Sequence, residues 1–298
     1  MNQIRLYFEC PARQATELAG ELETRFEADG YPVASFESDE AKGLWSVSVY
    51  LPPEEEGEAE AAIREILSVR DPAITIAREV LGDEDWVTRT LEGLAPVRAG
   101  GRFVVHGSHD RGCARAHEHA ILIDAALAFG SGHHGTTAGC LDMIGREMKR
   151  RRFKNALDLG SGTGVLAIAI AKAMHCPVLA SDIDPVAMNI AAENARLNGV
   201  GALIASITAA GFTHPSFAAR KPFDLIVANI LARPLQAMAA DLARHAASGG
   251  TVILSGLLPH QRARITAAYR LQGLHLAHTR YRDGWMTLVL LKPSARRT

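Results

Sequence analysis

A short apolar strand that runs directly into three closely spaced glycines is the feature that most constrains the fold of this chain. The segment reads Asn155–Ala–Leu–Asp–Leu–Gly–Ser–Gly–Thr–Gly164, and a helix is predicted to follow it. Glycine allows a positive φ and carries no Cβ, so a ligand can lie against the backbone at the carboxyl end of the strand. The segment therefore predicts a strand–turn–helix unit of an α/β sheet, with a ligand site at its turn.

Helices and strands alternate from about residue 138 onward. After a helix at 138–150, strands are predicted at 155–159, 177–182, 202–207, 223–229 and 250–255, separated by helices at 164–174, 185–198, 233–246 and 259–272. Alternation of this kind is typical of an α/β fold with a doubly wound, mostly parallel sheet. No helix separates the last two strands, 274–281 and 285–292, so they are predicted to form an antiparallel hairpin at the edge of the sheet.

The first part of the chain has a different order of elements. Strands are predicted at 4–10, 33–38, 44–51 and 74–80, with helices at 12–28 and 57–69. The order β-α-β-β-α-β is the ferredoxin-like α+β pattern. We therefore expect a small domain at 1–81 and a linker at 82–119, which contains a short helix at 83–92 and a strand at 102–106. A larger domain is expected at 120–298.

Composition excludes several classes of protein. The chain has 298 residues, a formal net charge of −1 and 48% hydrophobic residues, which are ordinary values for a globular protein of two domains. The overall charge gives no indication of nucleic-acid binding, and we interpret the basic run Lys149–Arg152 as a solvated helix end. The four scattered cysteines and the twelve histidines show no metal-ligand spacing, so we expect neither a metal site nor a disulfide.

The longest apolar run, at 165–171, is much shorter than the roughly 20 residues of a membrane span. The N-terminal residues also lack the long apolar stretch of a signal peptide. These two observations predict a soluble, cytoplasmic protein that does not bind a membrane.

The spacing of the glycines separates two classes of ligand. The turn reads G-x-G-x-G, whereas a dinucleotide site reads G-x-G-x-x-G, and an acid, Asp158, stands just before the first glycine. A pyrophosphate would avoid that negative charge, but the sulfonium and ammonium groups of S-adenosylmethionine (SAM) would tolerate it. The turn with Gly160 and Gly162 is therefore predicted to bind SAM, and an NAD-linked dehydrogenase is disfavoured.

Two acids follow the next predicted strand, in Leu179–Ala–Ser–Asp–Ile–Asp–Pro185. Asp182 lies where an acid receives ribose hydroxyls in folds of this kind, because two carboxylate oxygens match two vicinal hydroxyl donors. Asp184 precedes Pro185 and is interpreted as the N-cap of a helix. We therefore predict that Asp182 is a cofactor ligand and that Asp184 is structural.

A third predicted strand delivers Asn229 to the same edge of the sheet, in Phe223–Asp–Leu–Ile–Val–Ala–Asn–Ile–Leu–Ala232. The amide oxygen of Asn229 can accept a hydrogen bond from a substrate amine, and the carbonyl of Ile230 can accept another. The alternative is that Asn229 caps the helix at Pro234. A separate glycine-rich loop, 125–137, contains paired histidines and paired threonines and is predicted to be functional, with Thr136 or Thr137 capping the helix that follows.

These four segments together resemble the PrmA family, the methyltransferases of large-subunit ribosomal protein eleven. The family pattern F-G-T-G-x-H-x-T-T matches the residues from Phe129 to Thr137, and the order of the loop, D-x-G-x-G-x-G, D-I-D-P and N-I-L-A is preserved. The resemblance implies a class I SAM-methyltransferase sheet of Rossmann-like type. It also implies that the small N-terminal domain recognises the ribosomal protein substrate.

Carried over position by position, the resemblance implies cofactor contacts at Thr137, Gly160, Asp182 and Asn229, and we add their neighbours Asp158, Gly162, Phe129 and Gly130. His134 matches the loop histidine beside the active site. The substrate atoms implied are lysine ε-amines and, in some members, an N-terminal α-amine. The expected partner is this one protein substrate, bound by a monomer that requires no direct contact with nucleic acid.

The resemblance and the residues lead to a hypothesis for catalysis. A lysine amine has a pKa near ~10.4 in water and must lose a proton before it attacks a methyl group. We expect Asn229 to hold the amine hydrogens, whereas His134 is either a proton acceptor or only part of the pocket wall. Two alternatives stay open: a lysine methyltransferase for a different protein, and a non-catalytic SAM-binding factor of ribosome assembly. The N-P-P-Y motif of glutamine methyltransferases is absent, since Asn229–Ile–Leu–Ala232 stands there.

Overall fold

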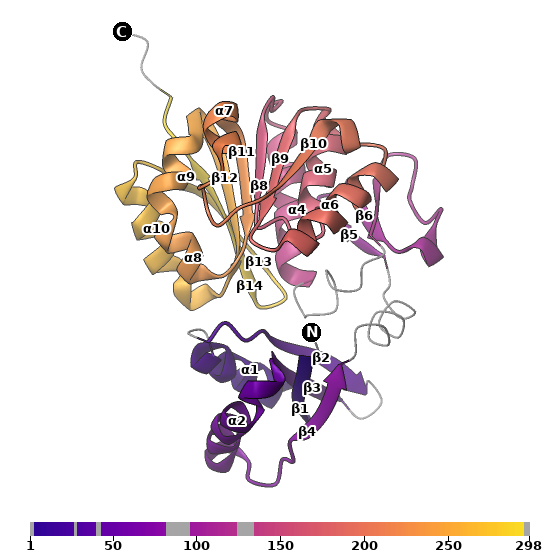
Figure 1. Cartoon of the computed structure of the whole chain (residues 1–298), viewed down its shortest axis with the longest axis vertical. Coiled ribbons are helices and arrows are strands. Elements are labelled where there is room, and N and C mark those ends of the chain that lie inside the picture. Colours follow the sequence, from indigo (N-terminus) through magenta and orange to yellow (C-terminus); the bar gives the residue numbers. More distant parts are fainter. Residues whose placement is uncertain (1–2, 27–28, 40–42, 82–95, 124–133, 295–298) are drawn as a thin grey trace. The chain divides into compact units, whose positions relative to one another are not determined.

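A computed structural model describes residues 3–26, 29–39, 43–81, 96–123 and 134–294, and these fall into two compact units that we treat separately. The first unit contains β1 (Gln3–Pro11), α1 (Ala12–Phe26), β2 (Val33–Asp39), β3 (Leu44–Leu51), α2 (Glu56–Arg70) and β4 (Ala77–Leu81) (Figure 1). Its four strands are antiparallel and lie in the order β2-β3-β1-β4. The predicted order of elements in this unit is confirmed.

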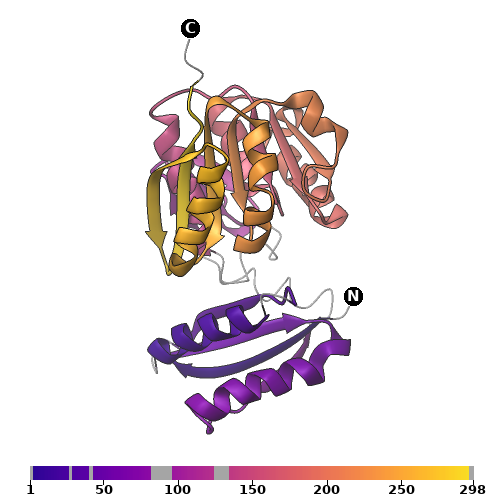
Figure 2. The ribbon, with the colours of Figure 1, turned by 90° about the vertical axis from the view of Figure 1, so that its left-hand side faces the viewer.

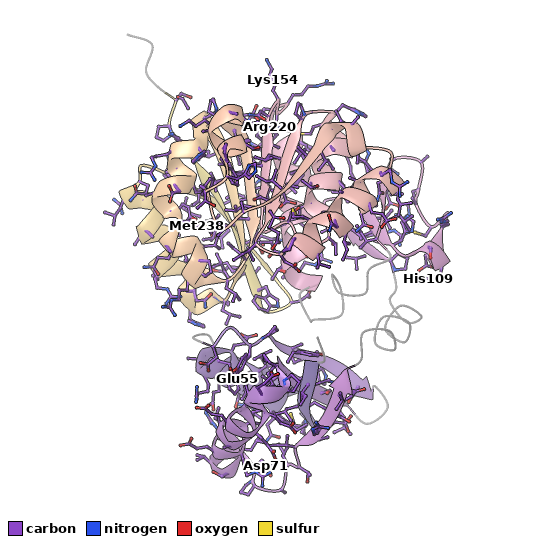
Figure 3. The ribbon with its side chains drawn as sticks, in the orientation of Figure 1. Glu55, Asp71, His109, Lys154, Arg220 and Met238 are labelled. Carbon is purple, nitrogen blue, oxygen red and sulfur yellow. The ribbon has the colours of Figure 1, made fainter. Side chains whose placement is uncertain are left out.

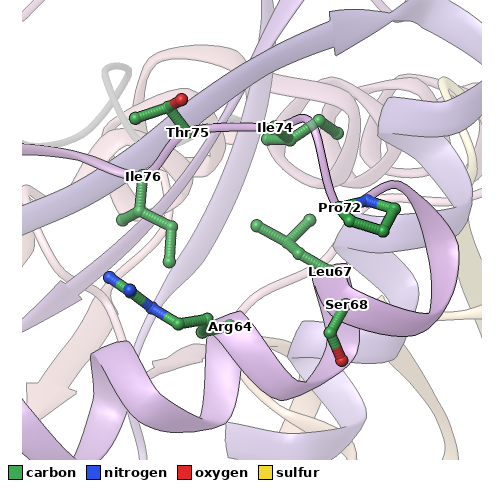
Figure 4. Close-up of a pocket in the computed structure, with 7 residues that line it drawn as sticks. All are labelled: Arg64, Leu67, Ser68, Pro72, Ile74, Thr75 and Ile76. Carbon is green, nitrogen blue, oxygen red and sulfur yellow. The ribbon is translucent and has the colours of Figure 1, made fainter.

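Alternation of apolar side chains explains how the first unit packs. Alternate residues of β1 and β3 share one buried cluster with the apolar stripe of α1 (Ala15, Leu18, Leu22 and Phe26). A cavity of about 270 Å³ lies between α2 and the segment that leads into β4 (Figure 4). It is lined by Arg64, Leu67, Ser68, Pro72, Ile74, Thr75 and Ile76. With one charged group and no paired acid or base, this lining does not indicate a reaction centre.

The second unit is built on a seven-stranded sheet in the order β10-β9-β8-β11-β12-β14-β13 (Figures 1 and 2). The strands are β8 (Ala156–Leu159), β9 (Val178–Asp182), β10 (Ile204–Thr208), β11 (Phe223–Asn229), β12 (Ala246–Leu257), β13 (His275–Arg282) and β14 (Trp285–Leu291). Six strands run in one direction, and β14 runs in the opposite direction between β12 and β13. The doubly wound, mostly parallel sheet with an antiparallel edge is therefore confirmed.

Helices cover both faces of this sheet. Figure 1 shows α4 (His134–Met148), α5 (Val165–Met174) and α6 (Pro185–Leu197) on one face, and α8 (Ala232–Ala237), α9 (Ala239–His245) and α10 (Arg262–Leu271) on the other. The helix expected at 233–246 is two helices, because the chain leaves helical geometry at Met238. The short helix α7 (Pro215–Arg220) was not predicted, since six residues are too few to show a helical period.

Part of the expected linker at 82–119 has a regular structure. β5 (Val97–Ala99), β6 (Phe103–His106) and β7 (His119–Leu122) form a small three-stranded sheet. The strand expected at 102–106 is confirmed, whereas the helix expected at 83–92 lies outside the described residues. This sheet packs on α4, because the amide of Gly100 donates to Asp142 Oδ1 over 2.7 Å, and a Cβ at Gly145 would lie 2.6 Å from the Gly100 oxygen. The structured part therefore begins before residue 120.

Within the described residues, no helix is long and apolar enough to cross a membrane. The four cysteines are free, and three of them (Cys10, Cys140 and Cys176) are buried.

Candidate cofactor and active site

The strand order reverses between β8 and β11, because β8 has its sequence neighbour β9 on one side and the later strand β11 on the other. In open α/β sheets a ligand binds at this switch point, outside the carboxyl ends of the strands. The predicted residues Asp158, Asp182 and Asn229 all lie at or next to this edge, on β8, β9 and β11 respectively. The topology thus brings together three segments that are far apart in the sequence.

The glycine turn after β8 is tightly constrained on one side and open on the other. Gly160, Gly162 and Gly164 have φ angles of 72°, 53° and 84°, which L side chains rarely adopt. A Cβ at Gly160 would lie 2.2 Å from Cγ2 of Ile230, whereas a Cβ at Gly162 would meet nothing within 4 Å. The turn therefore needs glycine for packing at residue 160, and it leaves open space beside residue 162.

Asp158 is fully buried beneath this turn. Its Oδ2 accepts hydrogen bonds from Ser161 Oγ (2.7 Å) and from the amide of Ala167 (2.9 Å), so it ties the turn to the start of α5. Burial raises the pKa of the Asp158 carboxyl to about 6, and the nearby Asp182 charge also raises it. Its Oδ1 is buried and has no hydrogen-bond partner among the described residues. Such an orphaned acceptor is costly unless a ligand or water supplies a donor.

The two acids at the end of β9, Asp182 and Asp184, have different roles, and the N-cap role predicted for Asp184 is confirmed. Asp184 is the N-cap of α6, since its Oδ1 accepts from the amide of Val186 over 2.8 Å, and Pro185 occupies the first turn. Asp182 is partly exposed, and its Oδ2 accepts from the amide of Gly162 over 2.9 Å. Each carboxylate oxygen has two lone pairs, so Asp182 retains capacity for two hydroxyl donors beside the glycine turn.

Asn229 is oriented by the first turn of α4. Its Nδ2 donates to Thr136 Oγ1 (3.2 Å) and to Thr137 Oγ1 (3.4 Å), while its Oδ1 accepts no hydrogen bond from the described residues. The two threonines lie inside α4, which begins at His134, so the expectation that one of them caps the helix is wrong. The N-cap of α8 is Leu231, with no side-chain cap, so a capping role for Asn229 is also excluded.

Residues that sequence reasoning missed hold α4 in this position. Ser255 Oγ donates to the Thr136 carbonyl (3.2 Å) and shares a 2.9 Å hydrogen bond with Thr287 Oγ1. A Cβ at Gly139 would lie 2.4 Å from the same Thr287 hydroxyl, and one at Gly135 would lie 3.0 Å from the Trp285 ring. The start of α4 is therefore fixed by close contact with β12 and β14. No local motif marks these residues, because they meet only when the sheet has formed.

Gly256 is a further missed residue. Its φ is 79°, and a Cβ there would lie 2.4 Å from the carbonyl oxygen of Ile230. The backbone that follows Asn229 therefore packs directly over the end of β12. The glycine in the apolar run Val252–Gly256 was the available sequence signal, since a glycine in a strand often marks a close backbone approach.

Three predicted residues are not placed by these contacts. Phe129 and Gly130 lie outside the described residues. His134 is the first residue of α4, but its side chain is not described. No group of three side chains suited to hold a metal ion occurs within the described residues.

The residues at this edge fit SAM. An orphaned buried carboxylate oxygen at Asp158 suits a cationic ligand, the free capacity of Asp182 suits a ribose diol, and the space at Gly162 admits a ligand against the backbone. A doubly wound sheet with an antiparallel seventh strand and this set of groups defines a class I SAM-dependent methyltransferase.

Comparison with known proteins gives the family. A family model described as ribosomal protein L11 methyltransferase (PrmA) matches residues 17–293. The protein of that name from Rhizobium meliloti (strain 1021) is 50% identical over 292 residues, which cover 98% of this chain and 100% of the relative. The protein of that name from Mesorhizobium japonicum is 51% identical over 290 residues, which cover 97% of this chain and 99% of the relative. The chain therefore belongs to the ribosomal protein L11 methyltransferase family and is a SAM-dependent protein methyltransferase.

A solved structure gives the same result. The crystal structure of the ribosomal protein L11 methylase from Lactobacillus delbrueckii subsp. bulgaricus is 28% identical, with a TM-score of 0.59. The match covers 67% of this chain and 98% of that chain. The resemblance inferred from the loop, the glycine turn and the two later motifs is therefore confirmed at the level of family and fold.

Proposed function

We propose that this enzyme transfers methyl groups from SAM to amino groups of ribosomal protein L11, at lysine ε-amines and at the N-terminal α-amine. The observation that carries the proposal is the geometry at Asn229. Both Nδ2 hydrogens face threonine hydroxyls, so the amide oxygen is left as an acceptor at the edge of the sheet. An amine that donates to this oxygen has its lone pair directed away from Asn229. SAM supplies a methyl group on a cationic sulfonium when it is bound.

Fixed orientation is the main contribution that we assign to these residues. Thr136 and Thr137 prevent the Asn229 amide from rotating, and Ser255 holds the backbone of Thr136. Groups held in this way raise the effective concentration of the amine at the reacting centre. A neutral amide also tolerates successive methylation, because it does not require a charged donor.

Cofactor contacts are proposed for eight residues: Asp158, Gly160, Gly162, Asp182, Asn229 and Thr137, with Phe129 and Gly130 on the loop before α4. The Asp158 carboxylate would balance positive charge on the ligand, and Asp182 would accept from ribose hydroxyls. His134 is proposed as the wall of the amine pocket or as a proton acceptor. Unchanged pH dependence of kcat in His134→Gln would exclude the second role.

We assign substrate recognition to the N-terminal unit, residues 1–81. The relatives carry the name of L11, and they match this chain over almost its full length, this unit included. Methyl transfer as proposed uses SAM and side chains of this chain alone, so it requires no direct contact with nucleic acid. We further propose that the enzyme acts as a monomer in the cytoplasm, where its substrate is made.

Mass spectrometry of large-subunit ribosomal proteins after incubation with enzyme and isotope-labelled SAM tests the proposal. We expect label on L11, in mass steps of one methyl group on lysines and on the N-terminus. Label found only on another protein would show that this other protein, and not L11, is the substrate. No label on any protein, together with tight SAM binding, would favour a non-catalytic assembly factor.

A further inference from the structure

The amino edge of the large sheet, where the parallel strands begin, carries a concentration of positive charge that the catalytic site does not use. Residues 147–154 and 220–224 contain seven lysines and arginines but only two acids, Glu147 and Asp224. This is a strong local excess in a chain whose net charge is −1. The basic run Lys149–Arg152 is part of it, but the fold adds cations that are not adjacent in the sequence.

Hydrogen bonds hold the two segments side by side. Asn155 Nδ2 donates to the carbonyls of Arg220 (2.6 Å) and Pro222 (2.9 Å). The amides of Lys154 and Asn155 both donate to the carboxylate of Asp224, over 2.8 and 3.0 Å. Figure 3 shows Lys154 and Arg220 projecting at the same end of the unit. The cations therefore form one surface, which we call the basic edge: Lys149, Arg152, Lys154, Arg220 and Lys221.

All five side chains of the basic edge are exposed, and none forms an ion pair with a described residue. Beneath them, the Arg151 guanidinium donates only to neutral groups, namely the carbonyls of Gly249 (2.5 Å) and Asp224 (2.9 Å) and the hydroxyl of Thr251 (2.9 Å). No carboxylate therefore compensates its charge. The other connections at this edge, 175–177, 199–203, 246–250, 272–274 and 292–294, contain no aspartate or glutamate. An unbalanced field of this kind attracts a polyanion.

The exposure of apolar and aromatic side chains indicates which polyanion fits: single-stranded nucleic acid, an anionic membrane or a nucleic-acid duplex. Phe153 and Phe223 are the aromatic residues of the two segments, and both are buried, at 3% and 0% exposure. Without exposed rings, the surface cannot stack unpaired bases. No large hydrophobic side chain of these two segments is exposed, so the surface cannot insert into a membrane interface. Lysine and arginine on short, hydrogen-bonded connections suit contacts to the phosphates of a duplex.

We propose that the basic edge binds the sugar–phosphate backbone of double-stranded RNA. The choice of RNA rests on the proposed function, because a ribosomal protein substrate assembles together with RNA. The contact is sequence-independent and lies at the sheet edge opposite the glycine turn. It would hold the enzyme near RNA without taking part in methyl transfer.

The test measures binding of the full chain to a fluorescent RNA duplex of 20 base pairs by anisotropy, at several KCl concentrations between 50 and 200 mM. Five phosphate contacts predict that log K falls with log[KCl] with a slope of about −4.5. In Lys154→Gln/Arg220→Gln the slope should become less steep by about 2. The matched control, Arg233→Gln/Arg262→Gln, removes the same charge from exposed positions elsewhere and should keep the wild-type slope.

Four results would overturn the proposal: no binding of the wild type at 50 mM KCl, an equal loss in the control, tighter binding to a DNA duplex of the same length, or variant-sensitive binding to phosphatidylserine vesicles but not to RNA. Thermal unfolding checks that each variant is folded. Methyl transfer to isolated L11, measured in parallel, should be unchanged in Lys154→Gln/Arg220→Gln. If the wild type transfers no methyl group to L11, the proposed function fails, while the RNA measurement stands by itself.

Discussion

The carboxyl edge and the amino edge of the seven-stranded sheet, where the parallel strands end and begin, contain similar residues with different roles. Each edge has an asparagine at a strand end and a glycine with φ near 70°: Asn229 and Gly160 at the carboxyl edge, Asn155 and Gly249 at the amino edge. The Asn155 amide donates to two backbone carbonyls, whereas the Asn229 amide is held by two hydroxyls and keeps an unused oxygen. Unused hydrogen-bonding capacity, rather than residue type, therefore distinguishes the candidate site from a structural edge.

The largest effect is expected from the pair of asparagines. Asn229→Ala should lower kcat by about 10²–10³-fold, as for removal of one positioned polar group in other active sites, while weak SAM binding persists. Asn155→Ala should leave kcat unchanged and lower the free energy of unfolding by about 1 kcal/mol, because it removes two exposed hydrogen bonds whose carbonyls can bind water instead. Steady-state kinetics and urea unfolding measure the two effects. Wild-type activity in Asn229→Ala would show that Asn229 has no role in catalysis.

The pair of left-handed glycines sharpens the same comparison. Both alanine substitutions carry a backbone penalty of about 1–2 kcal/mol. At Gly160 the new Cβ also meets Ile230 at 2.2 Å, whereas at Gly249 the nearest atom is the Ser294 hydroxyl at 3.0 Å. Gly160→Ala should therefore lose about 2–4 kcal/mol of stability and most of its SAM affinity. Gly249→Ala should lose only the backbone penalty, and calorimetric titration should give the wild-type Kd for SAM.

Asp158 predicts a dependence of stability on pH. Burial raises the pKa of the Asp158 carboxyl in the folded protein to about 6, above its ordinary value of 3.8, so the folded state binds the proton more tightly than the unfolded state. The charged Asp158 carboxylate therefore lowers the free energy of unfolding. This loss of stability is absent below pH 4, grows as the pH rises to 6, and is fully present at pH 7. Asp158→Asn should remove up to about 3 kcal/mol of this penalty.

Urea unfolding of wild type and Asp158→Asn at pH 4.5 and pH 7 measures the effect of this carboxyl. The difference in unfolding free energy between the two proteins should shift in favour of the variant at the higher pH. An identical shift with pH in both proteins would show that Asp158 is not the titrating group.

The smallest effect is expected at the helix cap. Asp184→Ala removes the hydrogen bond to the amide of Val186, which typically costs about 1 kcal/mol. SAM affinity should stay within about twofold of the wild type, because the cofactor role is assigned to Asp182. A large loss of SAM affinity in Asp184→Ala would show that Asp184 contacts the cofactor. Thermal unfolding and calorimetric titration give the two readouts.

Local sequence signals were sufficient for most of the fold. Strands such as β11 and helices such as α5 are marked by apolar runs and glycine turns, and the ferredoxin-like order of the first unit follows from alternation and helical period. Short elements escaped prediction, as in β5 with three residues and α7 with six, because a period cannot be read from so few positions. The small sheet of β5, β6 and β7 within 97–122 was predicted only at its middle strand for the same reason.

The candidate site was predictable in part. Asp182 and Asn229 follow apolar strands, so their place at one edge follows from the parallel topology. The contacts that orient Asn229 were not predictable, since Ser255 and Thr287 are ordinary polar residues until the sheet pairs β12 with β14. The burial of Asp158 beneath the turn was likewise invisible, because the sequence gives its position but not its depth.

The strand order determines which parts of the site could be exchanged together by recombination. β8, β9 and β10 precede β11–β14 in the chain and lie on one side of the switch point. The cofactor groups at 158–182 and the later residues 229–287, which contain Asn229 and the residues that fix α4, therefore come from two successive stretches. Recombination between related genes at the segment 209–222 would exchange Asn229, Ser255 and Thr287 as a block, whereas Thr136, Thr137 and the N-terminal unit would stay with the cofactor groups. An exchange of this kind would alter the surroundings of the amine without any change to the cofactor groups of β8 and β9 or to the unit assigned to substrate recognition.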